Sequence, residues 1–468
     1  MGARRRASGW AIPCVVVACV LGVIGVARVT GPARFDGAAE LQRLRAAGGP
    51  GDPSAENGWP ALVAIGKEID QVAFRISRRE EALDVAQIRA GGPEPEDWVR
   101  HLLVAPSWGD QSVRHQRLRR EAIDAVVAAG IIERLVAASA AGRFEAVLQD
   151  PGKGSGDFDA VANPQRGRVW ASFMALGAAA EDAVVRGEWE RAAELARAWC
   201  AVADAMGRQP GAGSWNDAAQ FERIIGMLVL RAVWEGGAES VPVCEALQDA
   251  WRGRATERLA FGLDGYRVEL RVQVEKVTAK RGESGRGALE IALPGVGFDP
   301  SRARAEVDEA WQAALRMRGS SAQEIDRMRR AHRNDESNPI TSYDSVGERT
   351  AEFFRMVQEA RAVECRTAAS RIVMGLAAYA ARHGAPPRSL GMLVPEFLPS
   401  VPSDPFAADE AFRYIAGPTM RDVVLYSVGV DGDDDGGQRG DSWVSGFEWP
   451  GWAVDAVIWP PWDVGSDE

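Results

Sequence analysis

The chain has 468 residues and a formal net charge of −11, with 46% hydrophobic and 26% charged residues. This length is enough for two or three domains, each with its own buried core. The acidic balance argues against a nucleic-acid partner, because binding to phosphates requires a basic face.

The N-terminus joins a basic start to an apolar stretch. Three arginines, Arg4 to Arg6, precede residues 10–29, in which Arg28 is the only charged residue. About twenty apolar residues are enough to cross a bilayer as a helix. Because arginines favour the cytoplasmic side, the sequence predicts a cytoplasmic stub (1–9), a transmembrane anchor (10–29) and an extracytoplasmic remainder.

Two processed forms remain as alternatives to this anchor. Gly25 to Ala27 has the small residues of a signal-peptide cleavage site. Val16 to Cys19 is similar to the lipobox of bacterial lipoproteins, which would place a lipid on Cys19. The residues after Cys19 stay strongly apolar, however, and this favours the uncleaved anchor.

A linker (30–58), which contains the Gly/Pro-rich run 48–53, leads to a region with helical periodicity. In residues 59–89 the apolar positions fall three and four residues apart, which is typical of an amphipathic helix. Similar patterns cover 112–136, 168–186, 188–206, 215–234 and 241–259. We therefore predict a helical domain of packed helices over residues 59–335.

Two features inside this domain need separate interpretation. Residues 266–277 alternate apolar and polar side chains, which indicates a strand or, almost equally, a continued helix. Outside the anchor the cysteines are Cys200, Cys244 and Cys365, an odd and scattered set that does not indicate a disulfide framework. Cys200 and Cys244 lie on apolar helical patterns, so we expect them to be buried as small hydrophobic residues.

After a polar boundary at 333–339, the character of the chain changes. A long helix is predicted over 345–383, and Pro386 and Pro387 end it. Short segments at 412–414, 423–428, 443–449 and 452–459 look like strands. Residues 340–468 are thus expected to form a long helix followed by a small antiparallel sheet. The tryptophans of the tail are expected to cover this sheet, with an aromatic binding surface as the alternative.

The strand at 423–428 runs into a turn that is crowded with carboxylates. Asp431, Asp433 and Asp435 occupy alternate positions, and Asp441 follows. A flexible turn that offers only oxygen ligands suits Ca²⁺. An EF-hand does not fit, because its twelfth position would be Ser442, which cannot supply a bidentate carboxylate. The alternative is a solvated acidic turn that binds nothing specifically.

The C-terminal motifs resemble a known module. They are Pro386-Pro-Arg-Ser-Leu390, Leu393-Val-Pro-Glu-Phe-Leu398, Val401-Pro-Ser-Asp-Pro-Phe406, Phe412-Arg-Tyr414, Leu425-Tyr-Ser-Val-Gly429 and Asp431-Gly432. This order resembles the periplasmic part of the major pseudopilin of type II secretion systems, over about 100 of the 468 residues.

The resemblance implies a structural Ca²⁺ site in the last loop of the sheet. By position it implies the carbonyl of Val428 and the carboxylate of Asp431 as ligands. Asp435 and Asp441 are the next candidates, and Asp433 is a possible substitute.

The rest of the chain departs from a pseudopilin. The apolar N-terminal segment carries no Glu and is separated from the matching helix by the helical domain. The whole chain is instead similar to membrane-anchored bacterial proteins of unassigned role that carry this module at their end. This implies a single-pass protein of the bacterial inner membrane.

Enzyme signatures are absent from the sequence. None of the four histidines has zinc-type spacing, and no Gly-x-Ser-x-Gly elbow or dinucleotide fingerprint occurs. We therefore predict no enzyme activity and no catalytic residues. The expected function is a membrane-anchored extracytoplasmic scaffold with protein partners in the cell envelope. One alternative is an accessory component of a type II secretion or pilus-like system. Another is an envelope enzyme, which a deep pocket with converging carboxylates within residues 59–335 would favour.

Overall fold

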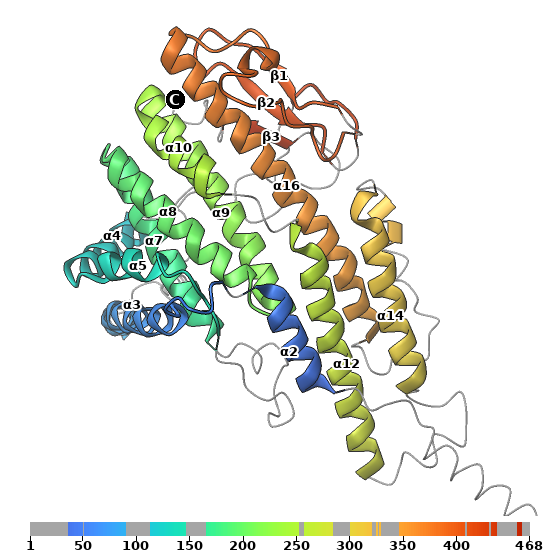
Figure 1. Cartoon of the computed structure of the whole chain (residues 1–468). Helices are drawn as coiled ribbons and strands as arrows, with labels where there is room; N and C mark the ends of the chain where they lie inside the picture. The colour runs from blue at the N-terminus through green and yellow to red at the C-terminus, as the bar shows by residue number, and fades with distance from the viewer. Residues whose placement is uncertain are drawn as a thin grey trace, which may run out of the picture.

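A computed structural model describes residues 36–49, 51–89, 113–146, 165–251, 257–283, 300–320, 324–325, 327–328, 346–407, 410–429, 432–437 and 456–460. In this part the chain is mostly helical and carries one small three-stranded sheet, as the sequence predicts (Figure 1). Over the same residues, no helix has the length and apolarity of a membrane span. The predicted anchor, residues 10–29, lies outside the described residues.

The helices follow one another with short connections. They are α2 (Gly37–Gly48), α3 (Trp59–Arg89), α4 (Val113–Ala128), α5 (Ile131–Ser139), α7 (Arg166–Val185), α8 (Trp189–Gly207), α9 (Ala212–Gly236), α10 (Val241–Ala250), α12 (Leu259–Glu283), α14 (Pro300–Arg316) and α16 (Val346–His383). Three 3₁₀ turns are η2 (Gly237–Ser240), η3 (Met317–Gly319) and η5 (Leu390–Leu393).

Helices α7 and α8 form a tight antiparallel hairpin. Gly187 turns the chain between them with φ = 70°, a left-handed conformation that favours glycine. At the crossing, Gly177 of α7 lets the indole of Trp199 approach closely, because a Cβ at Gly177 would lie 2.4 Å from Cζ2 of that ring. α3 packs on α7, and α9 and α10 pack on α8. The predicted burial of Cys200 and Cys244 is confirmed.

Residues 266–277 form part of helix α12, so the strand interpretation of this segment is wrong. The alternation arises because two faces of the helix are covered by different neighbours. Val268 and Val272 pack with the leucines of α2. Leu270 lies in a second cluster with the aromatic side chains of α16. Two buried faces on one helix obscure the single-face 3.6-residue period.

The long helix α16 joins the C-terminal sheet to the helical body. It packs along α9, α12 and α14, and the sheet lies against it (Figure 1). Strands β1 (Arg413–Ile415), β2 (Val424–Ser427) and β3 (Ala456–Trp459) are antiparallel in the order β1-β2-β3. Three of the predicted strands are thereby confirmed in their central residues. The predicted strand at 443–449 lies outside the described residues.

One hydrophobic core extends from the helical body into the sheet. Leu425 of β2 and Trp459 of β3 belong to the same buried cluster as residues of α3, α7, α8 and α9. Trp459 is 1% exposed, and its ring meets that of Trp234 on α9 edge-to-face at 5.8 Å. Its indole N–H donates to the carbonyl of Met420. At Trp459 the tail therefore closes the core, which is the expectation that tryptophans cover the sheet.

Candidate functional site

The predicted metal site begins where β2 ends, and a buried carboxylate holds this strand end. Asp404 is 2% exposed. Its Oδ1 accepts a hydrogen bond from the hydroxyl of Ser427 at 2.9 Å, and its Oδ2 accepts one from the backbone N–H of Val428 at 3.1 Å. The N–H of Phe406 also donates to Oδ1, at 3.0 Å. Val428, a predicted ligand through its carbonyl, is therefore rigidly placed.

Burial raises the pKa of the Asp404 carboxyl above its ordinary value, although the hydrogen bonds from Phe406, Ser427 and Val428 act in the opposite direction. The thiol of Cys365 lies nearby on α16, and burial raises its pKa well above the usual value, with the Asp404 carboxylate as a further cause. This cluster is a structural support of the strand end. It is too enclosed to meet a substrate.

The acidic turn itself folds back over the sheet through Asp434, a residue that the sequence analysis did not single out. Oδ1 of Asp434 accepts from the hydroxyl of Tyr426 at 2.9 Å and from the N–H of Gly436 at 3.1 Å. Oδ2 accepts from Nε of Arg413 at 2.9 Å. The Gly436 N–H, the Tyr426 hydroxyl and Arg413 together lower the pKa of Asp434.

The predicted calcium ligands are only partly described. Asp433 and Asp435 are exposed on either side of Asp434, and Val428 is buried at the strand end. Asp431 and Asp441 lie outside the described residues. Among the residues that are described, no three His, Cys, Asp or Glu side chains gather closely enough to hold a metal ion. The ligand set Val428, Asp431, Asp433, Asp435 and Asp441 stays a prediction.

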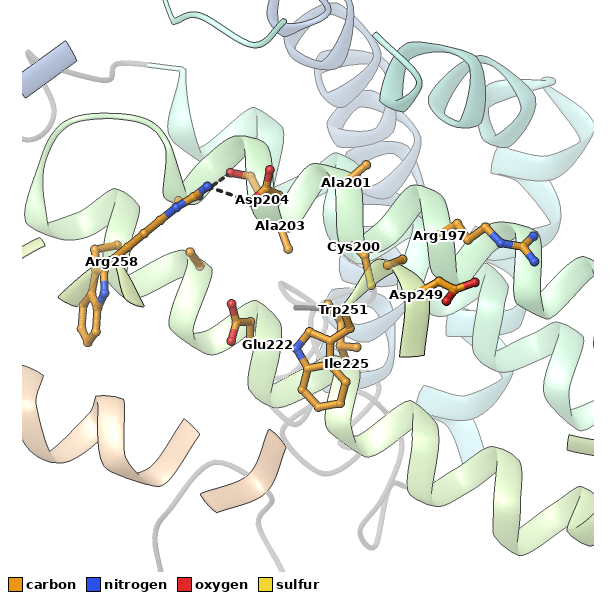
Figure 2. A pocket seen from close by; sticks show the side chains of 14 residues that line it. Arg197, Cys200, Ala201, Ala203, Asp204, Glu222, Ile225, Asp249, Trp251 and Arg258 are labelled. Carbon is orange, nitrogen blue, oxygen red and sulfur yellow. Dashed lines mark hydrogen bonds and ion pairs between the residues drawn. The ribbon is translucent and has the colours of Figure 1, made fainter. Parts of the chain in front are cut away.

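A cavity in the helical body is a second candidate site. It has a volume of about 350 Å³ and lies between α8, α9 and the end of α10. Several alanines form part of its wall, together with the indoles of Trp215 and Trp251 and the thiol of Cys200. The charged residues that line it are Arg197, Asp204, Glu222, Asp249 and Arg258. Figure 2 shows these side chains converging from separate segments.

At one end of the cavity, Asp204 of α8 is clamped by two arginines. Nη2 of Arg208, one turn later on the same helix, lies 2.6 Å from its Oδ2. Nη2 of Arg258 lies 2.9 Å from its Oδ1, and Nη1 of Arg258 donates to the backbone carbonyl of Asp204 at 3.0 Å. The Arg258 contacts are drawn as dashed lines in Figure 2. The negative charge of Asp204 is thus compensated by its neighbours.

Glu222 of α9 supplies a second carboxylate, on the opposite wall. It is only 7% exposed although it is an ionisable side chain. Burial raises the pKa of the Cys200 thiol far above its ordinary value, and the carboxylates of Glu222 and Asp204 add to this effect. The thiol is therefore protonated and a poor nucleophile at neutral pH.

Trp251 closes the cavity directly after α10. Its backbone N–H donates to Leu247 at 2.8 Å, and its ring edge packs near Gly226 of α9, where an added Cβ would lie 3.3 Å from Cη2. Trp251 is 3% exposed, and its indole Nε1 has no hydrogen-bond partner among the described residues. In Figure 2 this nitrogen points toward Glu222.

The sequence analysis missed this cavity. It interpreted the acidic residues of the helices as surface charge, and for Glu222 this interpretation is wrong, because α8 and α10 cover that face of α9. No motif or spacing links Asp204, Glu222 and Trp251, which come from three segments. The only local signal is the i, i+4 pair of Asp204 and Arg208.

No protein-family model matches the chain, and comparisons with curated proteins and with solved structures give no match either.

Proposed function

We propose that the protein is a membrane-anchored extracytoplasmic scaffold of the bacterial cell envelope, with a Ca²⁺-stabilised, pseudopilin-like module at its C-terminus. The single observation that carries the proposal is the order of elements at the C-terminus. Helix α16 leads into the antiparallel sheet β1-β2-β3, and β2 ends at the acidic turn. This is the order that the resemblance implies.

The shared core supports a scaffolding role. The sheet and the helical body bury side chains in one continuous cluster, so the module is held firmly against the rest of the chain. A rigid body with the acidic turn on its surface can present a fixed shape to protein partners in the envelope.

Calcium would act on the turn. Asp434 already holds the middle of the turn, and Asp433 and Asp435 stay exposed beside it. An ion bound to these flanking carboxylates, together with Asp431, Asp441 and the carbonyl of Val428, would relieve the repulsion between them. Because the ion binds the folded state, it would stabilise the module by linkage.

Thermal melting of the full-length protein in non-ionic detergent tests the calcium site. Saturating Ca²⁺ should raise the melting temperature by a few degrees relative to a chelator, since about 100-fold excess over Kd contributes about 2.7 kcal/mol. Asp431→Asn and Asp435→Asn should abolish this shift. Glu364→Gln, an exposed change on α16, is the matched control and should keep it. An equal melting temperature with Ca²⁺ and with chelator would remove calcium from the proposal.

The anchor and the orientation are tested separately. A periplasm-dependent reporter enzyme fused after Glu468 should be active in cells, because the C-terminus is expected outside the cytoplasm. A reporter that works only as a cytoplasmic fusion would refute the envelope location. Accessory function in a type II secretion or pilus-like system is the alternative within the same class, and co-assembly with a secretion ATPase or platform protein would favour it.

The cavity is the specific observation that favours a second class. Carboxylates of Asp204, Glu222 and Asp249 converge within residues 59–335, which is the feature expected of an envelope enzyme with an unrecognised site. Their arrangement argues more strongly for ligand binding than for a defined reaction.

A further inference from the structure

We propose that the cavity between α8, α9 and α10 binds a small organic cation that also carries a hydrogen-bond-accepting oxygen. This inference does not depend on the scaffold function or on calcium. The argument uses the size of the cavity, the placement of its charges, the indole donor of Trp251 and the aromatic walls.

The size of the cavity fits a small ligand. Pockets that take small molecules have volumes of roughly 300–1,000 Å³, and this one measures about 350 Å³. Cores of proteins are close-packed, with few voids larger than a water molecule. A space of this size inside a helix bundle, lined by alanines and by charged groups, is therefore not an ordinary packing defect.

The placement of the charges selects a cation. The guanidinium groups of Arg208 and Arg258 are engaged with Asp204. Glu222 presents its buried carboxylate from the α9 wall, across from that cluster. Burying a carboxylate is costly unless an opposite charge or hydrogen-bond donors accompany it. A ligand ammonium group beside Glu222 would supply both.

The indole of Trp251 adds a requirement for an acceptor. Its Nε1–H is buried, points toward the cavity and has no partner within the described part of the chain. An unsatisfied buried donor carries a desolvation penalty, which a ligand oxygen at this position would remove. The ring faces of Trp215 and Trp251 also line the space, and indole faces attract cations.

The entrance tolerates a polar far end of the ligand. Arg197 and Asp249 line the cavity and are exposed, so they mark its open side. Because their charges are opposite, they do not select the sign of the ligand. Charge selection takes place deeper, at Glu222.

Isothermal titration of the full-length protein with three probes of equal length tests the proposal. Aminopentanol is cationic, pentanediol is neutral and hydroxypentanoate is anionic, and all three carry a hydroxyl group. We expect aminopentanol to bind one per chain with a dissociation constant in about the millimolar range or tighter. Pentanediol and hydroxypentanoate should bind at least about tenfold more weakly, since they lose a charge-assisted hydrogen bond. No binding of aminopentanol, or equal binding of all three probes, overturns the proposal.

Two variants assign the effect to the cavity. Glu222→Gln should remove the preference for aminopentanol over pentanediol. Trp251→Phe should weaken both probes by a similar factor, because it deletes the donor to their shared oxygen and keeps the charge. Glu245→Gln, an exposed change on α10, is the control and should bind as the wild type does. Unchanged selectivity in Glu222→Gln refutes the site. If that variant melts too early to titrate, Trp251→Phe and the three-probe series decide the outcome.

Discussion

Asp404→Asn tests how the strand end that presents Val428 is held in place. The amide oxygen of Asn can replace Oδ1 and keep the bonds from Ser427 and Phe406. The amide nitrogen would then replace Oδ2, which accepts the N–H of Val428 at 3.1 Å. Two donors would face each other in a site where Asp404 is 2% exposed.

The expected cost follows from this geometry. A buried donor without an acceptor costs about 1–3 kcal/mol, and the substitution leaves two such donors, so we expect about 2–4 kcal/mol in all. If β2 opens locally, this corresponds to a faster amide exchange at the strand end by about 30-fold to 1,000-fold. Glu364→Gln on α16 replaces an exposed side chain and is expected to change stability by less than about 0.5 kcal/mol.

Hydrogen exchange measured by mass spectrometry on peptides that cover 423–429 reads this effect locally, and urea unfolding reads it globally. Exchange in Asp404→Asn should accelerate in this segment and stay unchanged in α7 and α8. If both the local exchange and the urea midpoint equal those of the wild type, the Asp404 contacts do not hold the strand and the reasoning is wrong.

Two further predictions concern packing and pH. Gly177→Ala should destabilise the protein by about 2–3 kcal/mol, because its Cβ would overlap the Trp199 ring. Gly167→Ala on the same helix meets open space and should be neutral or slightly stabilising, so equal urea midpoints for the two variants would contradict this packing. The Asp434 carboxyl has a lowered pKa, so its contribution to stability is present above the unfolded pKa and is lost as pH falls through the lower folded value. Asp434→Asn should therefore lower the melting temperature slightly at neutral pH, and this difference should vanish in acid. A difference that grows in acid would contradict the assignment.

Much of the secondary structure can be predicted from local patterns. The spacing of Leu62, Ile65 and Ile69 predicts α3, and the apolar run that begins at Val423 predicts β2. These signals are local because one face of each element is buried, and the period of burial is then printed in the sequence. Helix α12 shows the limit of this rule, since neighbours cover two of its faces and the period is lost.

The sequence by itself determined the helical character of the body, the long helix, the strands of the sheet and the existence of an acidic turn, because each depends on residues close together in the chain. Tertiary structure alone decided which aspartate anchors that turn: Asp434 is chosen by Arg413 on the neighbouring strand. It also decided that Glu222 is buried and faces Asp204 and Trp251 across a cavity. Burial and convergence depend on how helices pack, and residues separated along the chain carry no mark of their future neighbours.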